Sequence, residues 1–67
     1  MIIKLTDSEI RKFITAYNRL LEVSDIDVEG VELEFMPTGI GTAIEAHFIS
    51  KADHSRVTEN ITDYSLW

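Results

Sequence analysis

The residues of this chain that could do chemistry are two histidines and the carboxylates that lie near them. His47 follows Glu45 by two positions, and His54 follows Asp53 directly. Imidazole and carboxylate groups together are suitable ligands for transition metals. Two histidines without a fixed ligand spacing are a weak pattern, and a cross-strand pair of His47 with Glu32 accounts for the first of them without a metal. We therefore expect no metal and no cofactor.

A second pattern of carboxylates resembles the start of a calcium-binding loop. Asp25, Asp27 and Glu29 alternate with apolar residues before Gly30. An EF-hand loop ends on a bidentate glutamate, and Met36 stands at that position here. We interpret the segment as a solvated acidic edge.

Catalytic arrangements have little support in the sequence. Asp53, His54 and Ser55 are neighbours along the chain, but a catalytic triad is a spatial arrangement. Glu34 and Glu45 could act as an acid and a base only in a cleft that shifts one of their pKa values. An open sheet in a domain of 67 residues leaves no room for such a cleft. We expect a protein that is not an enzyme.

Acidic residues are concentrated in one part of the chain. The formal net charge is −6, and residues 23–50 contain six carboxylates and neither lysine nor arginine. These carboxylates are Asp25, Asp27, Glu29, Glu32, Glu34 and Glu45. Direct binding to nucleic acid is disfavoured, because such a surface needs cations that displace counterions from phosphates. A basic protein surface is the partner that this charge favours.

Carboxylates spaced along a strand, which rises roughly 3.3 Å per residue, can imitate a ladder of phosphates. We therefore expect an acidic module that mimics nucleic acid and binds a nucleic-acid-handling protein. The alternative is a solvated face that keeps a small domain soluble. Solvated faces intersperse both signs of charge, whereas residues 23–50 do not.

A predicted β-hairpin positions the central carboxylates. Val31–Phe35 and Thr42–Ile49 alternate apolar and polar residues on either side of a bend rich in proline and glycine. One face of the hairpin is then apolar, and the other carries Glu32, Glu34 and Glu45.

Two registers are compatible with this hairpin. When paired residue numbers sum to 79, Phe35 lies opposite Ile44, and Gly39 and Ile40 form a two-residue type II′ turn. When they sum to 81, Gly41 takes a left-handed or bulge position. The register is left open between these two.

An amphipathic helix precedes the hairpin and is expected to cover its apolar face. Thr6-Asp7-Ser8-Glu9 is a capping box, which marks the start of a helix. Apolar residues then recur at three- and four-residue steps as far as about Glu22. They are Ile10, Phe13, Ile14, Tyr17, Leu20 and Leu21. Ile3 and Leu5 form a short edge strand or an extended lead-in.

Residues 56–62 predict a third strand, with Val57, Glu59 and Ile61 on one face. A short helix through Val57, Ile61 and Tyr64 is the alternative. We expect Gly30 to form a bulge or bend before the hairpin. Three large apolar residues end the chain, and they either cap the core or anchor a partner. They are Tyr64, Leu66 and Trp67.

These elements predict a single α+β domain over residues 1–67, with the N-terminal helix packed on a small antiparallel sheet built around the 31–49 hairpin. The chain has no cysteine, which fits a reducing compartment. The apolar runs are too short for a membrane span. We expect a cytoplasmic protein without membrane contacts.

The helix start at 5–10, the strand at 31–35, the hairpin at 39–46 and the end at 61–67 together resemble small early-region proteins of tailed bacteriophages and prophages. The resemblance implies an inhibitor of a host defence protein, of the anti-CRISPR or anti-restriction type, that acts by stoichiometric binding in the host cell. It identifies no target. The alternative function is a structural or assembly protein, in which the helix and the C-terminal aromatic residues form a homodimer.

Overall fold

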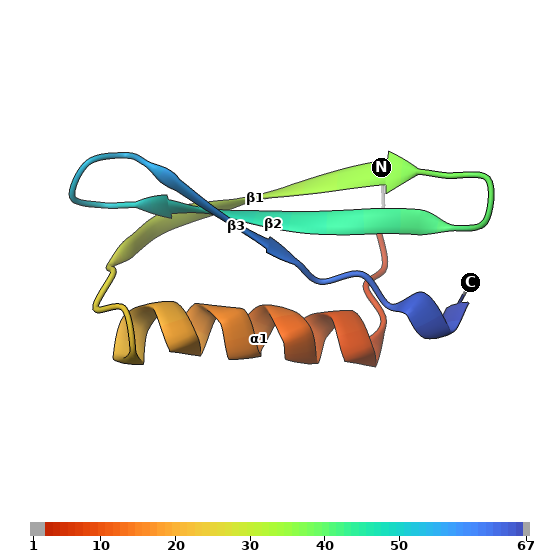
Figure 1. The fold of residues 1–67 in the computed structure, drawn as a ribbon, viewed down its shortest axis with the longest axis horizontal. Helices are drawn as coiled ribbons and strands as arrows, with labels where there is room; N and C mark the ends of the chain where they lie inside the picture. The colour runs from red at the N-terminus through yellow and green to blue at the C-terminus, as the bar shows by residue number, and fades with distance from the viewer. Residues whose placement is uncertain (1–2, 67) are drawn as a thin grey trace.

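A computed structural model describes residues 3–66, which fold into one helix and a three-stranded antiparallel sheet (Figure 1). Helix α1 spans Asp7–Glu22, and strands β1, β2 and β3 span Val28–Pro37, Thr42–Ser50 and Arg56–Asn60. A 3₁₀ helix, η1, follows at Tyr64–Leu66. The strand order β1-β2-β3 places β2 at the centre. The predicted α+β fold class is confirmed.

The start of α1 is the capping box that the sequence predicts. The Thr6 hydroxyl accepts a hydrogen bond from the Glu9 amide at 3.2 Å, and the Thr6 amide donates to the Glu9 carboxylate at 2.7 Å. Asp7 and Glu9 also place negative charge at the positive end of the helix dipole. Residues 3–6 form no strand, so they are an extended lead-in, and Leu5 packs against the core.

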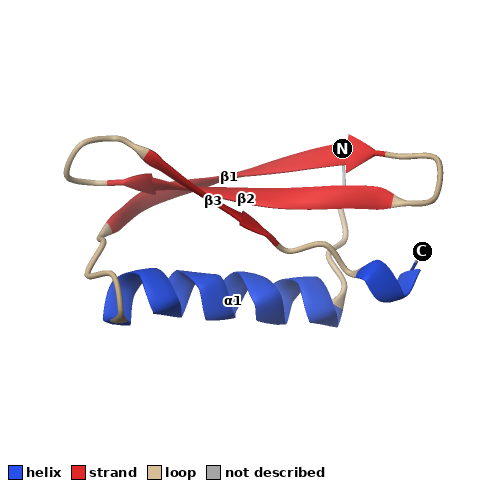
Figure 2. Cartoon of the chain, in the orientation of Figure 1, coloured by secondary structure: helices blue, strands red, loops and turns tan. Residues whose placement is uncertain are grey.

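The core lies between α1 and one face of the sheet (Figure 2). Phe48 on β2 is fully buried, and the rings of Phe13 and Tyr17 on α1 lie 5.3 and 6.1 Å from its ring. The buried residues of the core are Ala16, Leu20, Ile44, Ala46, Phe48 and Ile61.

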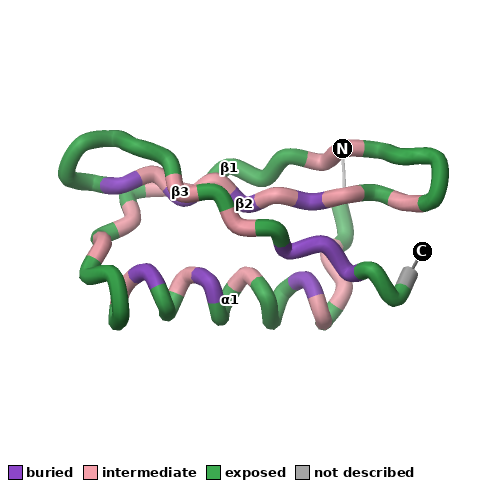
Figure 3. Tube along the Cα trace, viewed as in Figure 1, coloured by how far each residue is buried: buried purple, intermediate pink, exposed green. Residues whose placement is uncertain are grey.

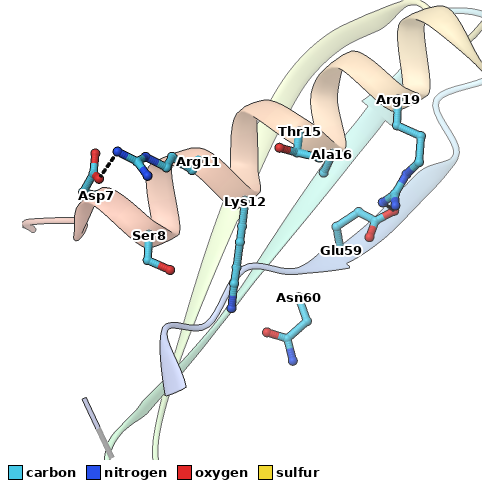
Figure 4. Close-up of a pocket in the computed structure, with 9 residues that line it drawn as sticks. All are labelled: Asp7, Ser8, Arg11, Lys12, Thr15, Ala16, Arg19, Glu59 and Asn60. Carbon is cyan, nitrogen blue, oxygen red and sulfur yellow. Dashed lines mark ion pairs between the residues drawn. The ribbon is translucent and has the colours of Figure 1, made fainter. Parts of the chain in front are cut away.

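The buried face of α1 is rotated relative to the predicted apolar stripe. Ile10 and Ile14 are 43% and 50% exposed, whereas Ala16 is buried. The opposite flank of the helix, with Lys12 and Arg19, faces β3 (Figure 4). Ile10 and Ile14 therefore lie on the flank nearer β1, at the margin of the core.

The hairpin register is the one in which paired numbers sum to 79, with Phe35 opposite Ile44 and Glu34 opposite Glu45. The register shifts between Val28 and Gly30, which is the bulge expected near Gly30.

The predicted type II′ turn is wrong, because no glycine among the described residues has the positive φ that this turn requires. The loop instead has four residues, Thr38–Gly41, after the last pair of Pro37 with Thr42. The Thr38 hydroxyl donates to the Gly41 carbonyl at 2.7 Å and accepts from the Gly41 amide at 3.1 Å. The Thr38 amide also donates to the Gly41 carbonyl at 2.6 Å, so Thr38 closes the turn through both its backbone and its side chain.

The third strand forms as predicted, and the alternative helix does not. Val57 lies opposite Phe48 and Glu59 opposite Ala46, on the face toward α1, and Ile61 is fully buried. Thr62 is also fully buried, and its hydroxyl accepts from the Ile44 amide at 2.8 Å. Helix η1 at the end of the chain is not anticipated by the sequence pattern.

Candidate functional site

Helix α1 covers one face of the sheet, and within residues 3–66 no helix covers the other, which we call the open face. The residues of β2 that point toward α1 are buried, and they alternate with half-buried residues that point away (Figure 3). The register then brings polar side chains from all three strands onto the open face. They are Glu32, Glu34, Glu45, His47, Arg56, Thr58 and Asn60.

The side chains on the open face form diagonal contacts across the sheet. Arg56 on β3 forms an ion pair with Glu32 on β1 at 2.8 Å. The two ring nitrogens of His47 lie 2.9 Å from the Glu34 carboxylate and 2.8 Å from the Thr58 hydroxyl. The expected pair of His47 with Glu32 is therefore not formed, although the two residues are direct neighbours in the register. Long side chains reach diagonal neighbours as easily as opposite ones.

The open face is less uniformly acidic than the segment 23–50. It brings together the predicted site residues Glu32, Glu34 and Glu45, but β3 adds Arg56 among them. The sequence pattern missed this cation because Arg56 is distant along the chain.

The other predicted acidic residues lie apart from these three. Asp25 and Asp27 are exposed in the loop between α1 and β1, and Glu29 lies at the start of β1. Figure 1 shows this loop at the same end of the sheet as the β2–β3 turn. Glu29 forms an ion pair with His54 of that turn at 2.8 Å. The carboxylates thus form two groups, one on the open face and one at this end.

The Asp53-His54-Ser55 sequence forms a turn. The amide and hydroxyl of Ser55 both donate to the Asp53 carboxylate, which lowers the pKa of Asp53 below its usual range. His54 has a left-handed φ of 60° and contacts Glu29 instead of its neighbours. Histidine tolerates this conformation better than most residues.

Tyr64 is the one C-terminal aromatic residue whose side chain the structure describes. It is 52% exposed, accepts a hydrogen bond from Asn60 at 2.8 Å, and lies beneath the Lys12 ammonium at 5.5 Å. Trp67, also a predicted partner contact, lies outside the described residues. Asn60 lies on the open face, so this hydrogen bond places Tyr64 beside that face.

A groove of about 450 Å³ between α1 and β3 was not singled out from the sequence (Figure 4). Its cations already have partners: Arg11 pairs with Asp7 at 2.9 Å and Arg19 with Glu59 at 2.7 Å. Lys12 donates to the Thr62 carbonyl. The i, i+7 spacing of Lys12 and Arg19 is the signal that could have indicated this basic flank. The ion pair of Arg19 with Glu59 and the hydrogen bond of Lys12 to Thr62 therefore tie the helix to β3 and to the segment that follows it.

Comparisons of the chain with protein-family models, curated proteins and solved structures find no match. No helix within residues 3–66 is long and apolar enough to cross a membrane.

Proposed function

We propose that this protein is an acidic binding module that presents the open face of its sheet to a basic surface of a protein partner. The observation that carries the proposal is that α1 covers only one side of the sheet, which leaves Glu32, Glu34 and Glu45 on a rigid and uncovered surface. Glu32 and Glu34 are about 6.6 Å apart along β1, because a strand rises about 3.3 Å per residue. Glu45 adds a carboxylate across the sheet from Glu34.

The partner that fits this surface is a nucleic-acid-handling protein, whose cationic groove normally receives phosphates. The net charge of −6 favours rapid association with such a groove. The ion pair of Glu32 with Arg56 holds one carboxylate in place, and both side chains remain more than half exposed. A cation of the partner can therefore replace Arg56. The resemblance to early-region phage proteins extends the proposal to an inhibitor of a host defence protein.

The test is a comparison of two variants that lose equal charge. The test variant carries Glu32→Gln, Glu34→Gln and Glu45→Gln. The control variant carries Asp7→Asn, Glu22→Gln and Asp53→Asn. Tagged wild-type protein is used to capture partners from a bacterial lysate at low salt in EDTA, and each purified partner is then titrated against all three proteins. We expect the test variant to bind about tenfold more weakly, with a flatter dependence of Kd on salt. The control variant should bind like the wild type.

Unchanged affinity of the test variant for a captured partner would exclude the open face as the binding surface. Equal weakening in both variants would indicate an effect of net charge alone.

A second candidate function, self-association, is favoured by apolar exposure on the β1 side of the domain. Ile14 on α1 is 50% exposed and Leu33 on β1 is 38% exposed, beside the unpaired edge of β1. Light scattering of the pure protein should then give a dimer mass, and Ile14→Asp should return it to a monomer. Removal of residues 66–67 tests the contribution of the C-terminus. A monomer at about millimolar concentration would exclude this function.

A further inference from the structure

Three side chains with metal-ligand atoms converge on the open face. A carboxylate oxygen of Glu34, one of Glu45 and a ring nitrogen of His47 all lie within 4.8 Å of one another. The convergence follows from the register, because Glu34 lies directly opposite Glu45 and His47 is two residues further along β2 on the same face. The three side chains are therefore positioned by paired strands, which hold a site more rigidly than loops do.

His47 is oriented as metal-binding histidines are. Its side chain is only 16% exposed, with Nδ1 at 2.8 Å from the Thr58 hydroxyl and Nε2 at 2.9 Å from the Glu34 carboxylate. A ligating histidine typically donates its other ring N–H to a fixed acceptor, which sets the tautomer. When the proton is on Nδ1 and is donated to Thr58, the Nε2 lone pair faces the carboxylates. In the other tautomer the Nε2–H donates to Glu34, and a metal ion bound to Nε2 would take the place of that proton.

The charges on this part of the open face also favour a bound cation. Like charges directly opposite each other on neighbouring strands destabilise a sheet, and Glu34 and Glu45 form such a pair. Within residues 3–66, no lysine or arginine forms an ion pair with either carboxylate, since Arg56 contacts Glu32 instead. A bound cation would remove the repulsion that the register imposes.

We propose that Glu34, Glu45 and His47 bind a divalent transition-metal ion of the zinc type. Two ligand atoms that share one ion at about 2.1 Å each lie no more than about 4.2 Å apart, so the site closes slightly on binding. Rotation of the exposed Glu34 side chain supplies that movement. The imidazole ligand selects against calcium, which takes oxygen ligands alone. Three protein ligands leave a fourth position open for water or for a donor from a partner.

The site is tested with the untagged full chain, because an affinity tag would bring histidines of its own. Zinc chloride is titrated by calorimetry at neutral pH, and cobalt absorption reports the coordination. We expect His47→Gln and Glu45→Gln to weaken zinc binding by at least tenfold, and Thr58→Val to weaken it by about tenfold through loss of the ring orientation. Imidazole nitrogen NMR should show the metal on Nε2 of His47.

Two substitutions are matched controls that keep the site intact. His54→Gln removes the other histidine, whose ring pairs with Glu29, and Glu32→Gln removes a neighbouring carboxylate of the open face. Both should bind zinc like the wild type. Absence of zinc binding up to about 1 mM would overturn the proposal, and so would equal loss in His54→Gln and His47→Gln. We expect Glu32→Gln to lower the affinity for a protein partner without lowering the affinity for zinc. The zinc site can therefore be disproved while the proposed function stands, and the proposed function can be disproved while the zinc site stands.

Discussion

Asp63 connects the two ends of the fold at the level of single side chains. Its carboxylate accepts hydrogen bonds from the hydroxyl and amide of Ser65 and from the Thr6 hydroxyl at 3.0 Å. Thr6 thus caps α1 and contacts the C-terminal segment with the same oxygen. The hydrogen bond of Ser65, followed by that of Thr6 and the charge of Lys12, lowers the pKa of Asp63 from its usual 3.8.

Asp63→Asn is expected to lower the Tm at pH 7, with the difference from the wild type shrinking in acid. A carboxyl group whose pKa is lower in the folded than in the unfolded protein stabilises the fold above the unfolded pKa. That stabilisation is lost as the pH falls through the folded pKa, so the melting temperatures of the two proteins should converge toward the acid end of the range. Thermal melts followed by circular dichroism between pH 2 and 7 measure the effect. A difference in Tm between Asp63→Asn and the wild type that stays constant from pH 7 to pH 2 would contradict this prediction.

The sequence predicted residue contacts only where they are local. The capping box of Thr6 with Glu9 spans three positions and follows from residue type alone. The bond from Thr6 to Asp63 spans 57 positions, and no pattern in the chain indicates it. On the open face, the opposition of Glu34 and Glu45 was predictable from the register, whereas the contact of His47 with Glu34 depends on rotamers that the sequence does not specify.

At the scale of elements, the short strand β3 is extended by a side chain. β3 ends at Asn60, and beyond it the Thr62 hydroxyl accepts from the Ile44 amide and donates to the Ile44 carbonyl. The Ile61 amide also donates to that carbonyl at 3.0 Å. Thr62 therefore supplies to β2 the hydrogen bonds that a longer β3 would have made.

Thr62→Val is expected to destabilise the protein by about 1–3 kcal/mol, because it keeps the shape of the side chain but leaves the buried Ile44 amide without an acceptor. Urea unfolding gives the free energy, and hydrogen exchange at the Ile44 amide should accelerate. Thr62→Ser keeps the hydroxyl, so its cost should be smaller. Equal stability of Thr62→Val and wild type would mean that the Ile44 amide finds another acceptor.

The helix and the strands were largely predictable from the sequence, but the side of each that faces the core was less so. The hairpin register was limited to two choices because a shift by one residue would turn the apolar side chains to water. The stripe of α1 was wrong at Ile10 and Ile14, since the side of the helix that is buried carries the small residue Ala16. Periodicity counts apolar residues and gives little weight to alanine.

At the scale of the whole molecule, stability depends on a very small core. Phe48 is 1% exposed and contacts two rings of α1. A domain of 67 residues is stable by roughly 3–10 kcal/mol. Phe48→Ala typically removes about 3–5 kcal/mol, which is a large part of that stability.

We therefore expect Phe48→Ala to be largely unfolded at 37 °C and Phe48→Leu to remain folded with a lower Tm. Dispersion of the amide proton NMR spectrum distinguishes the two states directly. Val23→Ala, at a side chain that is 79% exposed, should change stability by less than about 0.5 kcal/mol. A well-dispersed spectrum for Phe48→Ala would show that the helix and sheet are held together elsewhere.

The hydrogen bond of Thr6 with Asp63 also brings two distant parts of the chain together. The Thr6 hydroxyl and the Asp63 carboxylate are 57 positions apart in sequence and 3.0 Å apart in space. Joining the ends through a flexible linker and opening the exposed Thr38–Gly41 turn gives a permuted chain in the order β2, β3, α1, β1. Every strand pair of the native sheet can still form in it. Pairing of β1 with β2, however, becomes a contact between the two chain ends, so the permutant should reach the same fold more slowly.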